Sequence, residues 1–206
     1  VALAAGLFAT SCQESIVESQ VAGPTTFTVQ LPNQMGTKAI GDAENVDKLY
    51  VAVYNEADLG ATAIFKTKED VVNGVAKVTL NLIQDQSYDI VFWAQKGESY
   101  VDENSELLSI PMKNTFHNSE EGAAFFHFEP NFDPKQIRTK GIELRRPFAQ
   151  LNLGTTSESL SQIATGAVVL KSSEIKIKGL AQNFNTISGM GENPTGEVVS
   201  YSAIIP

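Results

Sequence analysis

The sequence predicts an all-β protein, a β-sandwich with one short helical insertion. Short segments of the chain alternate between apolar and polar residues with a period of two, which is the pattern of a half-buried strand. Gly, Pro and Asn residues separate these segments, as residues in turns do. Hydrophobic residues make up 42% of the 206 residues, which is enough to build a substantial core.

The first strand is expected over residues 25–31. Phe27, Val29 and Leu31 fall on one of its faces, and threonine and glutamine residues fall on the other. Because this alternation is strict, the strand should bury one face and expose the other. Pro32 follows directly and ends the segment.

Residues 76–82 alternate in the same way, whereas residues 48–54 and 88–95 are apolar on both faces and should lie centrally in the sandwich. Residues 96–121 are polar and rich in turn residues. The remaining expected elements are a short apolar segment at 125–128, an irregular or briefly helical stretch at 130–138, a strand at 144–153 with a defect at Pro147, a helix at 156–163 capped by Ser157, and strands at 167–170, 174–178 and 196–202.

The chain opens on an apolar run, residues 1–9, which is followed by Thr10, Ser11 and Cys12. We interpret residues 1–11 as a secretory signal peptide that lacks its start, because the run is too short to cross a bilayer of about 30 Å. Small residues before a cysteine resemble a bacterial lipobox, although the usual leucine three residues before the cysteine is Ala9 here. Cys12 is therefore the expected lipidation site, and the alternative is a lone buried cysteine.

Residues 12–24 are expected to be a lipidated tether, polar and acidic at first. Glu14 and Glu18 are similar to a surface-export signal of Bacteroides-type lipoproteins, and an ordinary linker remains an equal alternative. From these features together we expect the protein at the outer membrane and cell surface.

Enzymatic chemistry is not expected, because the sequence has no P-loop, no Gly-x-Ser-x-Gly motif and no metal-ligand spacing. We therefore expect no catalytic residues, no metal and no cofactor. The two histidines lie apart, and His127 is expected at the surface of a strand. Asp102, Glu103 and Glu106 share one segment without the glycine and distal glutamate of an EF-hand. The net charge of −9 argues against nucleic acid as a partner.

Aromatic residues leave one alternative function open. Trp93, flanked by Phe92 and followed by Tyr100, could stack on a sugar, as in a glycan-binding surface lipoprotein or adhesin. A tryptophan in the core is the favoured interpretation of the same residues.

Three stretches resemble the fimbrillins of Bacteroides-type type V pili. Residues 37–42 and 49–55 are similar to the processing site and first mature strand of these pilus subunits. Residues 144–153 resemble their Arg-rich strand, and residues 176–180 with 183–185 resemble the strand and turn that follow it. The order of these stretches downstream of a lipobox is similar to that in the family.

The resemblance implies a structural subunit that polymerises by strand exchange, with a transthyretin-like or Greek-key sandwich. A trypsin-like protease would cut between Lys38 and Ala39 and so remove the strand that carries Phe27, Val29 and Leu31. The implied partners are other pilus subunits, the outer membrane through the lipid anchor, the processing protease and a host or bacterial surface ligand. The expected organisation is a signal peptide at 1–11, a tether at 12–24, a removable strand and cleavage loop at 25–38, a β-sandwich domain at 39–180, and the start of a truncated second β domain or the last strands of the first at 181–206.

Overall fold

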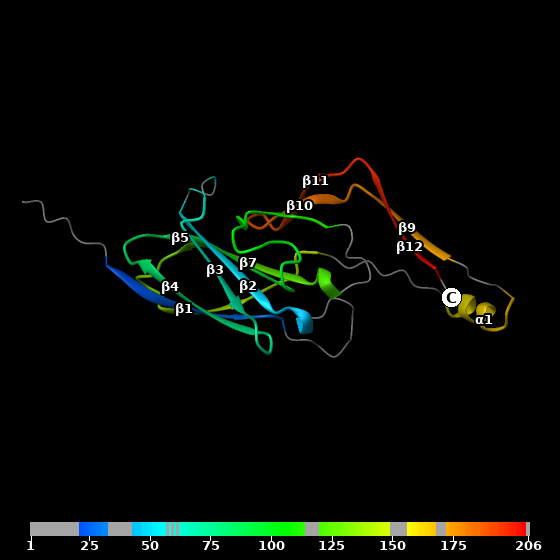
Figure 1. Ribbon diagram of the computed structural model, residues 1–206, viewed down its shortest axis with the longest axis horizontal. Coiled ribbons are helices and arrows are strands. Elements are labelled where there is room, and N and C mark those ends of the chain that lie inside the picture. The colour runs from blue at the N-terminus through cyan, green and yellow to red at the C-terminus, as the bar shows by residue number, and fades with distance from the viewer. Residues whose placement is uncertain are drawn as a thin grey trace, which may run out of the picture.

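The computed structural model of the protein describes residues 21–32, 43–56, 58, 60, 62–113, 120–148, 156–167 and 172–204. It confirms the predicted all-β sandwich with one short helix (Figure 1). The strands among these residues are β1 (Ala22–Gln30), β2 (Lys48–Asn55), β3 (Phe65–Asp70), β4 (Val75–Ile83), β5 (Tyr88–Gln95), β6 (Ser109–Pro111), β7 (Ala124–Phe132), β8 (Thr139–Glu143), β9 (Ser172–Lys178), β10 (Ala181–Asn185), β11 (Met190–Pro194) and β12 (Val198–Ile204); the helix is α1 (Ser157–Ala164), and single 3-10 turns cover Ala43–Asn45 and Glu120–Gly122.

Two sheets face each other across the main core. The first sheet has the order β4-β1-β8, and the second has the order β3-β2-β5-β7. The alternating faces of β1 and β4 point inward against one face of the second sheet. The core between the sheets is formed by buried apolar residues, among them Phe27, Val29, Leu49, Val51, Val78, Leu80, Ile90, Phe92, Phe125 and Phe132.

A third layer covers the other face of the second sheet. It consists of the 96–113 segment and a small sheet with the order β11-β10-β6. This layer explains why β2 and β5 are apolar on both faces, since each strand lies between two cores, as the sequence predicts. The second core contains Tyr50, Ala52, Tyr54, Val91, Trp93, Tyr100, Val101, Leu107, Ile110, Ala124, Phe126 and Phe184.

A buried amide joins the third layer to the middle sheet. Gln95, at the end of β5, is fully buried. Its Oε1 accepts from Nε1 of Trp93 at 2.8 Å and from the backbone amides of Tyr100 at 3.2 Å and Val101 at 3.1 Å. Its Nε2 donates to the carbonyls of Gly97 at 2.9 Å and Val101 at 2.7 Å. Because every polar atom of this amide is paired, its burial is stabilising.

A carboxylate makes a second polar link in the same region. Glu106 accepts from the Tyr54 hydroxyl at 3.1 Å and from the Ala63 amide at 2.9 Å, and it forms an ion pair with Lys66. Burial alone would raise the pKa of Glu106, but the bonds from Lys66, Ala63 and Tyr54 outweigh burial and lower this pKa. Burial, with the bond to Glu106, raises the pKa of Tyr54 in turn. Glu106 is therefore a structural anion that fixes the 96–113 segment against β2.

The strands from β9 to β12 form one long hairpin with a kinked stem. β10 pairs with β11 at its tip, and β9 pairs with β12 along its stem. The kink lies at Gly179, whose φ of 76° suits glycine, and the Thr195 amide donates to the Leu180 carbonyl across it at 2.8 Å. The tip packs on the sandwich, and the stem leads away from it towards α1 (Figure 1).

Several sequence-based expectations about elements are wrong. The expected strand at 144–153 is not formed over residues 144–148, where only Arg145 makes a single bridge, to Phe126. The reason is that Pro147 has no N–H to donate, while Arg145 and Arg146 place their guanidinium groups 4.7 Å and 5.3 Å from aromatic ring centroids. Residues 149–153 lie outside the described residues.

Other differences are smaller. The first part of the 130–138 stretch belongs to β7, which extends to Phe132. The N-cap of α1 is Thr156 rather than Ser157, and its Oγ1 accepts from the Ser159 amide at 3.2 Å. Of the expected strand at 167–170, Ala167 is in a bend, and the rest lies outside the described residues.

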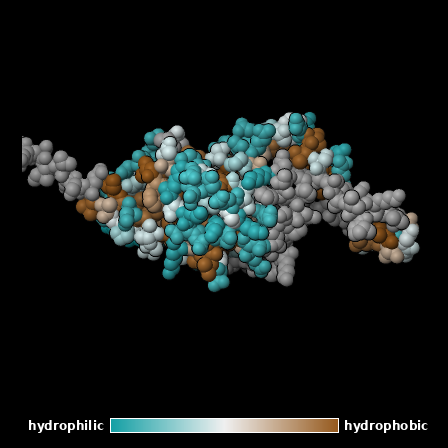
Figure 2. All heavy atoms as spheres, in the orientation of Figure 1, coloured by the Kyte–Doolittle hydropathy of each residue, from teal (hydrophilic) through white to brown (hydrophobic). Residues whose placement is uncertain are grey.

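Hydrophilic residues dominate the face of the sandwich in view, and hydrophobic residues are exposed at its rims and over α1 (Figure 2). Leu160 of α1 and Val198 of β12 are 54% and 52% exposed. Within the described part of the chain, no helix has the length and apolar character needed to cross a membrane.

Candidate functional site

β1, the first strand among the described residues, lies in the middle of its sheet. It pairs antiparallel with β4 from Ala22 to Gln30, and parallel with β8 from Thr26 to Gln30. Further backbone bonds continue the ladder: the Leu31 amide donates to the Gly74 carbonyl, and the Leu144 amide donates to the Gln30 carbonyl, both at 2.9 Å. Among the described strands, β1 is thus the one that joins β4 to β8 in this sheet.

The inward face of β1 fills the centre of the main core. Phe27, Val29 and Leu31 are 0%, 2% and 7% exposed, so the sequence prediction of a buried stripe is confirmed. The ring centroid of Phe27 lies 5.4 Å from that of Phe92 and 5.0 Å from that of Phe132. The slot that β1 occupies between β4 and β8 is therefore lined by aromatic rings at residue 27.

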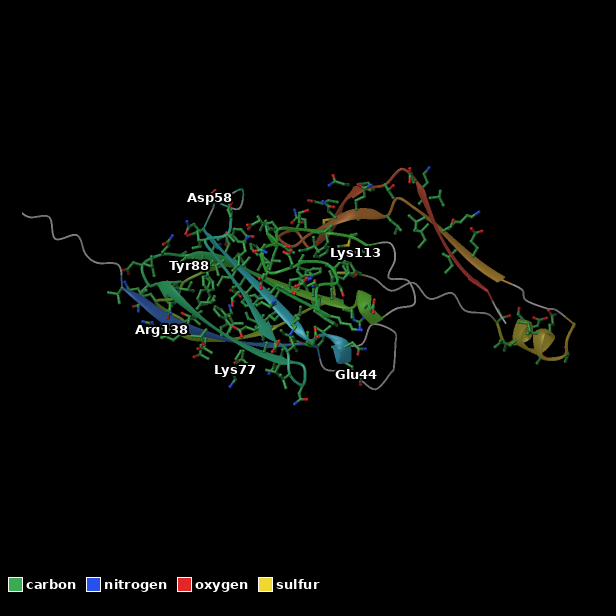
Figure 3. All side chains as sticks on the ribbon, in the orientation of Figure 1. Glu44, Asp58, Lys77, Tyr88, Lys113 and Arg138 are labelled. Atoms are coloured by element: carbon green, nitrogen blue, oxygen red, sulfur yellow. The ribbon has the colours of Figure 1, made fainter. Side chains whose placement is uncertain are left out.

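The opposite face of β1 is polar and partly open. Thr26 and Thr79 lie opposite each other, with their hydroxyl oxygens 3.2 Å apart. Lys77 lies opposite Thr28 on β4 and points outward to solvent (Figure 3). The pairing of polar residues across β1 and β4 leaves this face soluble.

Charged side chains close the side of the core next to β8. Nζ of Lys140 on β8 lies 2.6 Å from Oε1 of Glu129 on β7, and so connects the two sheets. Nε2 of His127 lies 3.2 Å from the other oxygen of Glu129. His127 is half-buried on the same side of β7 as Phe125, with its ring centroid 6.2 Å from that of Phe92, which corrects its expected place at the surface.

The N-terminal end of β1 differs from the rest of the strand. Within the described part of the chain, residues 22–25 pair with β4 alone, because the pairing with β8 begins at Thr26. The inward positions here are Gly23 and Thr25, both buried. A Cβ atom on Gly23 would lie 2.5 Å from Nη1 of Arg138, which lies near this end of β1 (Figure 3). Thr25 is 0% exposed, and its hydroxyl is without a hydrogen-bond partner.

Comparison with known proteins gives a family but no function. Residues 18–205 match a family described as a family of unknown function (DUF6562). This chain belongs to DUF6562. No curated protein matches it. Among solved structures, the DUF6562 chain is similar to the tip fimbrial protein Mfa3 from Porphyromonas gingivalis with C-terminal truncation, with 13% identity and a TM-score of 0.41. The similarity covers 79% of this chain but only 58% of that one, and at this TM-score it supports no conclusion by itself.

Only some of the predicted site residues of this DUF6562 member lie among the described residues. Phe27, Val29 and Leu31 lie together on β1. Cys12, Lys38 and Ala39 lie outside the described residues. Among the described residues, no three His, Cys, Asp or Glu side chains come together as metal ligands would.

The rings of Trp93 and Tyr100, which could stack on a sugar in the glycan-binding alternative, do not form an exposed surface in this DUF6562 member. Trp93 is 0% exposed and Tyr100 is 9% exposed, with their ring centroids 5.8 Å apart in an edge-on arrangement. Burial raises the pKa of Tyr100 to about 12. Both rings therefore belong to the second core, as the favoured interpretation of Trp93 predicts.

Sequence reasoning missed Thr25 as a site residue, although a signal was present. Thr25 has the same parity as Phe27 and Val29, so the alternation already places it on the buried face. Its lack of a hydrogen-bond partner follows from what the neighbouring strands present to the hydroxyl, which the sequence alone does not reveal.

Proposed function

We propose that this DUF6562 member is a structural subunit of a cell-surface pilus that joins its neighbours by strand exchange. The observation that carries the proposal is the position of β1, the first strand of the described chain and the middle strand of its sheet. Loss of β1 would turn the facing edges of β4 and β8 into open edges. An extended strand from another subunit could then add to both of them.

The energetics favour a firm joint. A strand in the place of β1 would bury side chains equivalent to Phe27, Val29 and Leu31, at roughly 1.5–3 kcal/mol each before ordering costs. Backbone hydrogen bonds to β4 and β8 would contribute about 1 kcal/mol each. These terms leave a net stabilisation after the entropic cost of association.

Processing is part of the proposal. A trypsin-like protease would cut between Lys38 and Ala39, because Lys38 is the only basic residue between Pro32 and Lys48. Lys48 itself lies in β2, and its Nζ contacts Asp70 at 2.5 Å. Backbone pairing on both sides protects β2 from a protease, which needs an extended and accessible segment.

The proposed subunit reaches the cell surface as a lipoprotein. Acyl chains on Cys12 would hold it in the outer membrane until processing. Its partners would be other pilus subunits, the processing protease and a host or bacterial surface ligand. The alternative function, a glycan-binding surface lipoprotein, gains no support from Trp93 and Tyr100, because both rings are buried.

Limited trypsin digestion of the folded protein tests this function. We expect the first cut after Lys38, identified by N-terminal sequencing, and slow loss of the fragment that contains β1. The remaining chain should then form ladders of oligomers on a native gel. A Lys38→Gln variant, which retains β1, is the matched control and should stay monomeric. The proposal fails if the Ala39-start chain loses β1 and remains monomeric in the presence of full-length subunits.

A further inference from the structure

We propose that a strand replacing β1 enters at the N-terminal end of the slot, and that the position of Thr25 selects a branched aliphatic side chain of the size of valine from the incoming strand. This inference rests on the proposed function and names the chemistry of the partner strand.

The first argument is the buried hydroxyl of Thr25. The side chain has no exposed surface, and its Oγ1 has no hydrogen-bond partner. It lies on the same face as Phe27, opposite Leu80, which is 1% exposed. Burying a hydroxyl without a partner is unfavourable, whereas valine has nearly the same shape and carries a methyl group there. The slot therefore fits an aliphatic residue better than the threonine that occupies it.

The second argument is a gradient along β1. The inward positions run from Gly23 and Thr25 at one end to Phe27, Val29 and Leu31 at the other. The aromatic contacts of Phe27 with Phe92 and Phe132 hold the second part of the strand. The apolar side chains that stabilise β1 are thus concentrated beyond residue 25.

The third argument is backbone pairing. Of the strands that the structure describes, residues 22–25 have a neighbour on one side, whereas residues 26–30 have neighbours on both sides. Pro24, which lacks an N–H, falls in the part with one neighbour, where such a residue is tolerated. Fewer backbone bonds and smaller buried side chains both make residues 22–25 the first to open.

These features define how replacement proceeds. The incoming strand pairs first with the edge of β4 that residues 22–25 release, and its aliphatic side chain occupies the place of Thr25. It then displaces residues 26–31 stepwise, so that at each stage a bond lost by β1 is made by the new strand. The end of β1 with one neighbouring strand acts as the entry point. Thr25 is the buried position of β1 at which replacement by an aliphatic side chain is favourable.

The test uses full-length protein in which a site for a sequence-specific protease is placed between Asn33 and Asp42, so that nicking leaves β1 bound without a covalent link to β2. Fluorescent peptides copying residues 22–31 compete for the slot. One peptide carries Thr25, one carries Thr25→Val, and a matched control carries Thr28→Val on the outward face.

At equal concentrations and at equilibrium, we expect at least about a fivefold excess of bound Thr25→Val peptide over the Thr25 peptide, since an unpaired buried hydroxyl costs about 1–3 kcal/mol. The Thr28→Val peptide should bind within about twofold of the original. Equal binding of the Thr25 and Thr25→Val peptides overturns the selection at this position while leaving strand exchange intact. If no peptide enters the slot, strand exchange itself fails, and the inference fails with it.

Hydrogen exchange of the intact protein tests the entry point separately. The amides of Gly23 and Thr25 should exchange at least about tenfold faster than those of Phe27 and Val29. The Thr25→Val protein should unfold at a higher denaturant concentration than the original, whereas Thr28→Val should not. Equal protection along β1, or a Thr25→Val protein that is less stable than the original, contradicts the proposal.

Discussion

Among single residues, Gln95 shows how a polar group can organise an apolar layer. Its side chain pairs with Trp93 on its own strand and with the backbone of the 97–101 turn, all within the second core. The amide thus fixes the point at which the 96–113 segment leaves the middle sheet and turns back over it.

Replacement of this amide should be costly. Gln95→Leu keeps the volume but leaves the Trp93 indole N–H and the amides of Tyr100 and Val101 without an acceptor. We expect the free energy of unfolding to fall by at least about 3 kcal/mol, measured by urea denaturation. Gln30→Leu, on the exposed face of β1, is the control and should change it by no more than about 0.5 kcal/mol. A Gln95→Leu loss as small as the control would refute this role.

The candidate site was partly predictable at this scale. Period-two alternation sufficed to place Phe27, Val29 and Leu31 in the core, because one buried face enforces that pattern. The same pattern included Thr25, but its unpaired hydroxyl depends on what β4 and the opposing sheet present there. His127 was misplaced because β7 is covered on both faces, which no local pattern around residues 125–128 reveals.

At the level of elements, the sequence predicted the strands that have an apolar face. It missed polar strands that pair with the edge of a neighbouring strand. β2, β4 and β5 were found within a residue or two. β3 and the tip hairpin of β10 and β11 are largely polar, and they pair with the edges that β2 and β6 offer. The charged residues of β3 also protect an exposed edge of the sheet from further pairing.

Besides its backbone pairing with β6, the tip hairpin contacts the second core through the ring of Phe184. Phe184 is 2% exposed, and its centroid lies 4.7 Å from that of Phe126, 5.9 Å from that of Phe148 and 6.1 Å from that of Trp93. Phe184→Ala should lower the free energy of unfolding by about 3–5 kcal/mol.

Tryptophan fluorescence reports on this change directly, because Trp93 is the single tryptophan of the chain. Its emission should shift to longer wavelength as water reaches the second core. Phe65→Ala, at a position 48% exposed on β3, is the matched control and should leave the emission unchanged. An unshifted spectrum in Phe184→Ala would show that the third layer is held in another way.

For the whole molecule, the expected lipid anchor can be tested independently of the sandwich. Cys12 is the single cysteine, so a thiol-linked lipid has one possible site. Cys12→Ala should abolish incorporation of labelled palmitate and surface delivery while leaving the unfolding midpoint of the purified protein unchanged. Cys12→Ser separates loss of the thiol from loss of a polar side chain and should behave in the same way. Continued labelling of either variant would contradict the lipobox interpretation.

In the proposed pilus, the long kinked hairpin would determine how a load on Ile204 reaches the sandwich. A pull on Ile204 travels along the backbone of β12 and β11 to the tip, which holds to β6 through three residue pairs and to the sandwich through Phe184. The sheet that contains β1 lies two layers away from that load. Under such a load the third layer should therefore detach from the middle sheet first. The sheet around β1 should keep its structure while the stem extends.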